Sequence, residues 1–199
     1  MDELILDILQ QLRDGSQGAL DTHQLEMLIN SHNSGIDSSA HSTEREKLIP
    51  KRAILPYFLQ VKQKNDELWQ SWNVTPELEE RFVHSVRMKP RRTASGVATI
   101  TVITRPHTCS SNCIYCPCDL RMPKSYLANE PACQRAELTF FDPYVQVAAR
   151  LQALHQMGHS TDKVELIVLG GTWSDYPESY QYWFIKELFR ALNDWPNSP

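Results

Sequence analysis

The stretch from Lys163 to Thr172, KVELIVLGGT, decides the fold. Its nearly continuous apolar run suits a strand covered on both faces, and the glycine pair ends it. An earlier β-branched run, VATITVI at 97–103, predicts a first strand. Residues 142–158 carry the cap residues and the apolar spacing of a helix, and residues 180–192 carry the apolar spacing of a second one. The order strand, helix, strand, helix predicts an α/β fold with parallel strands and right-handed crossovers.

Residues 1–86 predict a helical amino-terminal region instead. Apolar residues recur at helical spacing in 4–12 and again in 25–29. Pro50 and Pro56 are expected to separate a short turn from a following helix, because proline removes a backbone donor and crowds the preceding turn. The front half of the chain is therefore expected to be mostly helical.

Two further features set the predicted domain organisation. Thr75-Pro76 supplies a cap and a first-turn residue for another helix. The stretch 30–43 is rich in Ser, Asn and His and predicts a flexible joint. Residues 87–199 then begin the α/β region. Because two parallel strands cannot form a sheet buried on both faces, we expect further chain or another subunit to complete it.

The composition is that of an ordinary globular protein, with 199 residues, 41% of them hydrophobic, and a net charge of -4. No run of 18 apolar residues occurs, and the start lacks the basic flank of a signal peptide, so we expect a cytoplasmic protein with no membrane partner. Residues 84–107 carry basic residues and no acid. This stretch is the candidate contact for RNA phosphates. Its basic residues are Arg87, Lys89, Arg91, Arg92 and Arg105.

All five cysteines fall between positions 109 and 133, which indicates a local metal or cluster site and not a disulfide framework. Cys109, Cys113 and Cys116 have the spacing C-x3-C-x2-C directly after a predicted strand, so their thiols can converge. Soft thiolates select iron-sulfur clusters or zinc. A [4Fe-4S] cluster on three cysteines leaves one iron open to a small molecule. The alternatives are a structural zinc site that adds Cys118, or buried thiols without a ligand.

Two neighbouring features are candidates for binding a cofactor. Tyr115 can pack beside a ligand of the open iron, or it can be an ordinary core tyrosine. Gly170-Gly171-Thr172 follows the second strand, and glycines let the backbone approach a ligand closely. An ordinary strand end would have the same composition.

The cysteine spacing resembles that of radical S-adenosylmethionine enzymes. In that superfamily the three cysteines hold a [4Fe-4S] cluster, and the open iron chelates the methionyl group of S-adenosylmethionine. One-electron reduction then yields a 5'-deoxyadenosyl radical. A Gly-Gly pair after the second strand binds the amino group of the cofactor. The resemblance implies that this chain holds the first two βα units of a partial (β/α) barrel.

Several further motifs resemble the catalytic subunit of Elongator and its single-chain bacterial and archaeal relatives. They include CIYCP at 113–117, Ser125-Tyr126, and GHSTDKVELIVLGGTW at 158–173, within a region from about Arg87 to Asn193. This likeness implies radical carboxymethylation of the wobble uridine (U34) of tRNA at carbon 5, with acetyl-CoA as the acetyl donor. It also implies that Lys163 is a catalytic residue that contacts acetyl-CoA.

The same likeness implies parts that lie outside this sequence. A further stretch of barrel and an acetyltransferase-like domain would be supplied by more chain or by a second chain. The amino-terminal region would help to bind tRNA, and its secondary contacts would be Lys47, Lys51, Arg52, Lys62 and Lys64. Cys118 departs from the family pattern, in which glycines follow the Cys-Pro pair.

Three other hypotheses about the function of this sequence stay open. One is a truncated or split radical protein that binds the cluster without activity of its own. Another is a radical enzyme with a different substrate, and the third is a zinc-binding interaction module.

Overall fold

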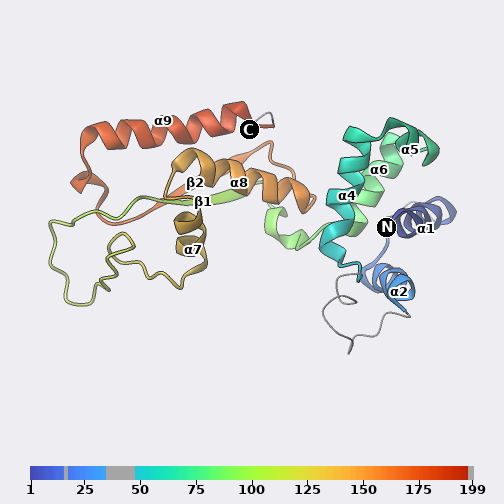
Figure 1. Cartoon of the computed structure of the whole chain (residues 1–199), viewed down its shortest axis with the longest axis horizontal. Coiled ribbons are helices and arrows are strands. Elements are labelled where there is room, and N and C mark those ends of the chain that lie inside the picture. Colours follow the sequence, from blue (N-terminus) through green and yellow to red (C-terminus); the bar gives the residue numbers. More distant parts are fainter. Residues whose placement is uncertain (16–17, 35–47, 197–199) are drawn as a thin grey trace. The chain divides into compact units, whose positions relative to one another are not determined.

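The computed structural model describes residues 1–15, 18–34 and 48–196. The chain forms two compact units (Figure 1). The first comprises Met1–Arg92 with Gln156–His159, and the second comprises Thr93–His155 with Ser160–Pro199. No helix that the structure describes is both long and apolar enough to cross a bilayer.

The first unit is helical, as the sequence predicts. Its apolar residues share one core in which the rings of Phe58 and Phe82 stack with centroids 4.1 Å apart, and Trp72 is almost fully buried. Burial of each large aromatic ring contributes on the order of 2–3 kcal/mol to stability. The helices are α1 (Asp2–Asp14), α2 (Thr22–Asn33), α4 (Lys51–Lys64), α5 (Asp66–Ser71) and α6 (Pro76–Val86).

Side-chain caps fix the starts of three of these helices, and in α5 the Asn65 side chain accepts from the backbone N–H of Leu68 at 3.1 Å. Asp21 accepts a hydrogen bond from the backbone of Gln24, whose side chain returns one to the backbone of Asp21. Thr75 caps α6 by accepting from the backbone N–H of Leu78 at 3.2 Å. The capping box fixes the start of α2, and the helix runs to Asn33, so residues 30–33 are helical and not part of a joint. Residues 35–43 of the expected joint lie outside the described residues.

The expectation for Pro56 is wrong. It lies inside α4 and does not separate a turn from a helix, whereas Pro50 is the N-cap residue of that helix. A proline inside a helix costs about 3 kcal/mol. The helix continues because Ile54, Leu55 and Phe58 are buried in the shared core on either side of the proline. Packing against the core outweighs the local cost.

The second unit contains a parallel pair of strands, β1 (Ala98–Ile103) and β2 (Val164–Leu169). Their register pairs Ala98 with Val164 and Ile103 with Leu169, so both strands end at the same edge. The unit's helices are α7 (Pro131–Leu138), α8 (Pro143–Gln156) and α9 (Glu178–Asp194). There are also two short 3-10 helices, η1 (Pro90–Thr93) and η2 (Trp173–Asp175), and η1 spans the boundary between the units.

Gly158 follows α8 in the left-handed conformation expected of a helix-ending glycine, with φ +83°. In the view of Figure 1, α9 lies above the two strands and α7 lies below them. Residues 104–130 contain turns but no helix or strand, and they form the long loop that leaves the end of β1.

A side chain closes the edge of β1 that faces away from β2. On the outer edge of β1, the buried Gln146 side chain accepts from the backbone N–H of Ile103 and donates to its carbonyl, both at 2.9 Å. These two bonds occupy the groups that another strand would use, so pairing stops there.

The expectation that β2 is covered on both faces is wrong for the residues that the structure describes. Ile167 and Val168 remain 39% and 37% exposed. The sequence pattern is that of a buried strand, but the described chain has no third strand and leaves these two side chains, which point to opposite faces, partly uncovered. The structure therefore shows an α/β unit with two strands.

Candidate cysteine site at the carboxyl ends of the strands

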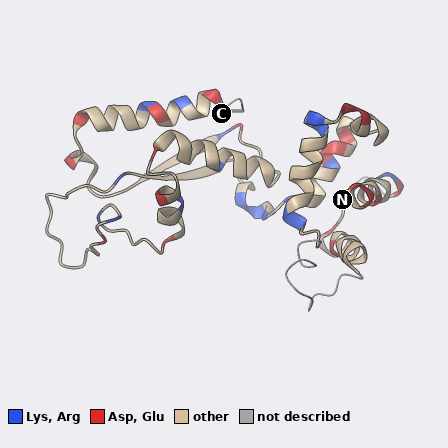
Figure 2. Ribbon diagram, viewed as in Figure 1, with Lys and Arg blue, Asp and Glu red and all other residues tan. Residues whose placement is uncertain are grey.

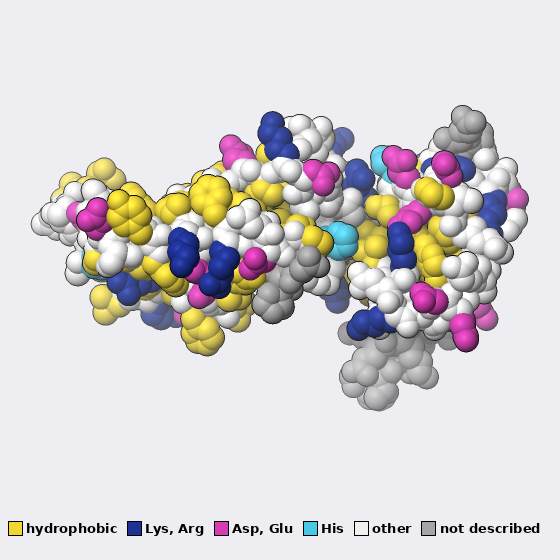
Figure 3. Space-filling view, turned by 90° about the horizontal axis from the view of Figure 1, so that it is seen from above, with side chains coloured by type: hydrophobic (Ala, Val, Ile, Leu, Met, Phe, Trp, Pro, Cys, Tyr) yellow, Lys and Arg dark blue, Asp and Glu magenta, His cyan; other side chains and the backbone are white. Residues whose placement is uncertain are grey.

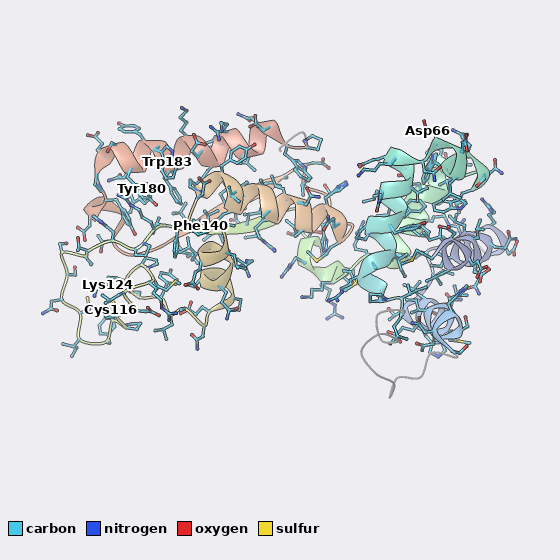
Figure 4. All side chains as sticks on the ribbon, in the orientation of Figure 1. Asp66, Cys116, Lys124, Phe140, Tyr180 and Trp183 are labelled. Atoms are coloured by element: carbon cyan, nitrogen blue, oxygen red, sulfur yellow. The ribbon has the colours of Figure 1, made fainter. Side chains whose placement is uncertain are left out.

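The three thiols with the C-x3-C-x2-C spacing line one cavity of about 240 Å³. Cys109, Cys113 and Cys116 reach it from the loop after β1, and Thr172 reaches it from the segment after β2. Figure 4 shows Cys116 and Lys124 close together in that loop. The cavity therefore lies at the edge where both strands end, which is where parallel α/β folds carry their ligands.

The donor set of this cavity fits an iron-sulfur cluster. The three cysteines are free, and Cys113 is exposed. Within residues 1–15, 18–34 and 48–196, no three His, Cys, Asp or Glu side chains stand close enough to hold a metal ion without rearrangement. The thiols of this cavity are therefore not gathered for a single metal ion.

The first cysteine is held from the segment after β2. The Cys109 sulfur lies 3.4 Å from the Thr172 hydroxyl, and this hydrogen bond lowers the pKa of the thiol, with a smaller effect from the backbone of Ser111. A lowered pKa favours the thiolate, which is the form that binds metal. Contact with Thr172 thus favours the thiolate form of Cys109.

Asp175 anchors the residue next to Cys109. Its carboxylate accepts from the Ser110 backbone N–H at 2.7 Å and from the Ser110 hydroxyl at 2.9 Å. These bonds, the backbone one first, lower the pKa of Asp175. A ring nitrogen of His107 lies 2.9 Å from the Asp175 carbonyl, and its ring stacks on Tyr176. The start of the cysteine loop is thereby fastened to the end of β2.

Lys124 places a positive charge beside the cysteines. Its Nζ donates to the Cys118 sulfur at 2.9 Å, and the pKa of Lys124 is raised by this bond first and then by the charge of Cys118. Lys124 and Ser125 line the cavity, whereas Cys118 does not. The Ser125 hydroxyl lies 3.3 Å from the Cys116 sulfur. This placement disfavours a zinc site made of Cys118 and the three cavity cysteines.

Cys133 is separate from this group. It is fully buried with Ile103, Met122 and Ala136, and burial raises the pKa of its thiol. A thiol with a raised pKa in apolar surroundings is a core residue and a poor ligand.

The two glycines after β2 differ in the space around their α-carbons. A Cβ on Gly170 would lie 2.0 Å from the Thr104 hydroxyl, so only glycine fits there. A Cβ on Gly171 would lie no closer than 3.5 Å to Lys124. Both glycines line a second cavity of about 350 Å³ beside the strand ends. The other residues lining this glycine cavity are Thr104, Tyr126, Val168, Leu169, Trp173 and Ile185.

The remaining predicted site residues fall in different places. Tyr115 is 85% exposed and lines the cysteine cavity. Lys163 is exposed and immediately precedes β2, at the opposite end of the strand from Gly170. A strand of this length spans roughly 20 Å. The structure therefore does not bring Lys163 to the cysteine cavity. Lys163 lies where β2 begins, and the cavity lies where β1 and β2 end, so the length of the strand separates them.

The predicted RNA-binding residues are divided between the two units. Lys89, Arg91 and Arg92 are exposed around η1, where Figure 2 shows basic residues gathered, and Arg87 is half-buried. Arg105 is exposed in the second unit. Among the secondary candidates, Lys62 pairs with Glu79, Arg52 and Lys64 are exposed, Lys51 is half-buried, and Lys47 lies outside the described residues.

Sequence reasoning missed His107, Lys124 and Asp175. Only the last had a usable signal, since it lies three residues after the Gly-Gly-Thr segment that ends β2. Lys124 and His107 lie in an irregular loop whose path no periodicity reveals.

Comparison with known proteins places this chain beside tRNA-modifying enzymes. It is 43% identical over 126 residues to the tRNA uridine(34) acetyltransferase of Methanocaldococcus infernus, covering 60% of this chain and 24% of that one. It is 48% identical over 105 residues to the protein of that name from Dehalococcoides mccartyi, covering 53% and 23%. Elongator complex protein 3 of Bos taurus is 40% identical over 131 residues, covering 60% and 24%.

The chain is a relative of these proteins. The resemblance stated from the motifs is confirmed, and it holds over about three fifths of the chain. The chain spans about a quarter of the length of these curated relatives. No protein-family model matches it.

Proposed function

We propose that this chain is the part of a tRNA uridine-34 modifying enzyme that carries a radical S-adenosylmethionine centre. The observation that carries the proposal is that three thiols line one cavity at the strand ends. It occurs in a chain 43% identical to a tRNA uridine(34) acetyltransferase. Three soft donors in an open cavity suit a cluster with one free iron.

In this proposal Cys109, Cys113 and Cys116 hold a [4Fe-4S] cluster. With S-adenosylmethionine bound, the centre would supply a 5'-deoxyadenosyl radical. The chain's own contribution is positional. Thr172 favours the Cys109 thiolate, and Asp175 fixes the backbone that precedes Cys113.

The glycine cavity supports binding of the nucleoside part of that cofactor. Gly171 leaves room beside the backbone, whereas the Thr104 side chain fills the space beside Gly170, and Trp173 and Tyr126 offer aromatic surface in the same cavity. Thr172 lines the cysteine cavity and Gly171 lines the glycine cavity, so one ligand could extend from the cysteines to the glycines. Tyr115 is the aromatic residue at the rim of the cysteine cavity.

The substrates are proposed from the relatives. The acceptor would be the wobble uridine of tRNA, modified at carbon 5 by a carboxymethyl group derived from acetyl-CoA. Lys163 lies at the far end of β2, so any contact it makes with acetyl-CoA is separate from the cysteine cavity. The exposed edge of β2 is consistent with further barrel strands from more chain or from a second chain.

The experiment is anaerobic incubation of the reconstituted chain with tRNA, S-adenosylmethionine, acetyl-CoA and a reductant. Mass spectrometry then measures 5-carboxymethyluridine and 5'-deoxyadenosine. We expect 5'-deoxyadenosine from the chain and none from Cys113→Ala, and 5-carboxymethyluridine when a second chain supplies the remaining barrel and the acetyltransferase-like domain. Deoxyadenosine without modified uridine in that complemented reaction would contradict the tRNA substrate. The absence of both products from a chain loaded with iron would contradict catalysis by this chain alone and favour the split-protein reading.

A further inference from the structure

A third cavity, of about 520 Å³, lies in the second unit and is unexplained by the cofactor sites. We call it the aromatic cavity. Figure 4 shows Phe140, from the turn after α7, and Tyr180 and Trp183, from α9. Its lining contains one basic side chain and no acidic one. The lining residues are Arg105, Phe140, Phe141, Pro177, Ser179, Tyr180 and Trp183.

The backbone at the rim of this cavity is strained. Phe140 and Phe141 follow α7 with φ +52° and +57°, in the left-handed region where glycine is the usual residue after a helix. Their N–H groups donate to the carbonyls of Glu137 and Ala136, which holds the turn. Phe140 is nevertheless 90% exposed, so burial of its ring contributes little to the free energy of folding. A bulky ring in a glycine position, displayed to solvent, indicates a role in binding.

Arg105, another lining residue of the cavity, is held in place by Tyr180. Its guanidinium carbon lies 4.5 Å from the centroid of the Tyr180 ring, and its backbone N–H donates to the Tyr180 hydroxyl at 3.1 Å. Among the described residues, no carboxylate forms an ion pair with Arg105. Stacking leaves the edge of a guanidinium free for a phosphate, which it binds in a bidentate manner.

We propose that the aromatic cavity binds one unstacked nucleotide of a single-stranded RNA loop. The base stacks on Phe140 and Trp183, which is 41% exposed, and Arg105 takes a phosphate. Flat exposed rings with one fixed cation match the stacking and electrostatic pattern of single-strand binding. The lack of an acidic lining residue disfavours a basic peptide.

The place of the cavity suits a loop presented for modification. Arg105 precedes Cys109 by four residues in the segment that leaves β1, so the cavity lies at the same sheet edge as the cysteines. A base that is modified must leave its stack, and holding a neighbouring nucleotide would stabilise the opened loop. This inference rests on the proposed function, because it deepens the tRNA contact of the same enzyme.

The test measures binding of a fluorescently labelled anticodon stem-loop RNA to the 199-residue chain by anisotropy. The variants are Phe140→Leu, Trp183→Leu and Arg105→Gln. Loss of one stacking contact is expected to raise Kd by about 10-fold. Tyr182→Leu and Phe189→Leu are matched controls, because these exposed aromatic residues of α9 do not line the cavity. The controls are expected to bind like the unchanged chain.

Phe140→Gly separates binding from folding. Glycine relieves the left-handed strain, so this variant is expected to melt at the same or a higher temperature while it binds RNA more weakly. If Phe140 were only structural, the variant would lose stability and keep its affinity.

The outcomes distinguish this inference from the proposed function. Binding that weakens in the cavity variants and not in the controls supports it. Binding that is equal in cavity variants and controls overturns the aromatic cavity as an RNA site but leaves the proposed function standing. No binding by the unchanged chain overturns the cavity assignment together with the tRNA contact of the proposed function.

Discussion

Cys109 has a hydroxyl and a backbone donor beside its sulfur, whereas Cys133 is enclosed by apolar side chains. The pKa of the first thiol is lowered and that of the second is raised. Two residues of the same type therefore differ in chemistry because of their neighbours. At the scale of single residues, the sequence spacing identified the three candidate ligands, but their supporting residues became visible only in the structure.

The anchoring role of Asp175 gives a residue-scale prediction. Asp175→Ala removes both bonds to Ser110, so the start of the cysteine loop should loosen. We expect a reconstituted chain to lose iron to a chelator several times faster than the unchanged chain, and the electron paramagnetic resonance signal of the reduced centre to broaden. Asp162→Ala, at an exposed position, is the control. Equal rates of iron loss for both variants would contradict the role of Asp175.

Gly170 gives a second residue-scale prediction. Gly170→Ala places a methyl group against the Thr104 hydroxyl, and overpacking of this kind costs about 1–3 kcal/mol. We expect a lower melting temperature and weaker binding of S-adenosylmethionine, measured by calorimetry. Gly171→Ala has room for its methyl group and should retain the stability of the unchanged chain. A pair of variants with the same melting temperature would refute the close approach at Gly170.

Helices and strands that depend on signals in their own residues could be predicted from the sequence. Those that depend on contacts with distant segments could not. The start of α6 and the bounds of α8 and of the β-branched strand β1 were predicted close to those observed. The helix α7 was missed, because its eight residues carry only a weak apolar stripe. Pro56 was misjudged because the packing that holds α4 together comes from other helices.

Gln146 gives a prediction at the scale of elements. Gln146→Leu leaves the N–H and carbonyl of Ile103 without their buried partner, and each unsatisfied group costs about 1–3 kcal/mol. We expect thermal unfolding of the second unit at a clearly lower temperature. Gln152→Leu changes an exposed residue of the same helix and should have little effect. If Gln146→Leu kept the original melting temperature, the edge of β1 would be satisfied in another way.

His159, in the segment after α8, leads to a prediction of how stability depends on pH. Burial lowers the pKa of His159 below 6.5, and the nearby charges of Arg87 and Arg92 lower it further. As pH falls below 6.5, the unfolded chain takes up the proton first, so stability should fall from that pH through the lowered folded pKa. Above pH 6.5 the histidine should contribute no pH dependence.

The measurement is the melting temperature at pH 7.5 and at pH 5.5. His159→Gln should show a smaller loss on acidification than the unchanged chain, and His23→Gln, at an exposed position of α2, should show the same loss as the unchanged chain. An identical loss in all three proteins would exclude His159 as the cause.

At the scale of the whole molecule, the described chain leaves apolar surface uncovered. Figure 3 shows apolar side chains exposed on the second unit, and the exposed residues of α9 include Tyr182, Ile185 and Phe189. With the uncovered strand β2, this surface is consistent with further βα units that the sequence resemblance implies. Two strands cannot by themselves establish a barrel, so the barrel stays a proposal.

The candidate site could be predicted only in part for the same reason. Local spacing gave the cysteines and the glycine pair, which lie at neighbouring strand ends because parallel strands share an edge. Lys163 was assigned by resemblance alone, and the structure places it at the opposite edge from the cysteines. Residues from distant segments, such as Phe140 and Trp183, come together only through the tertiary fold.

The central claim is that Cys109, Cys113 and Cys116 hold a cluster without Cys118. Anaerobic reconstitution followed by metal analysis tests it most directly, on the unchanged chain, on Cys113→Ala and on Cys118→Ala. The account predicts about four irons per chain in the unchanged protein and in Cys118→Ala, and loss of the cluster in Cys113→Ala. Iron retained by Cys113→Ala, or zinc in near-equal molar amount without iron, would contradict it.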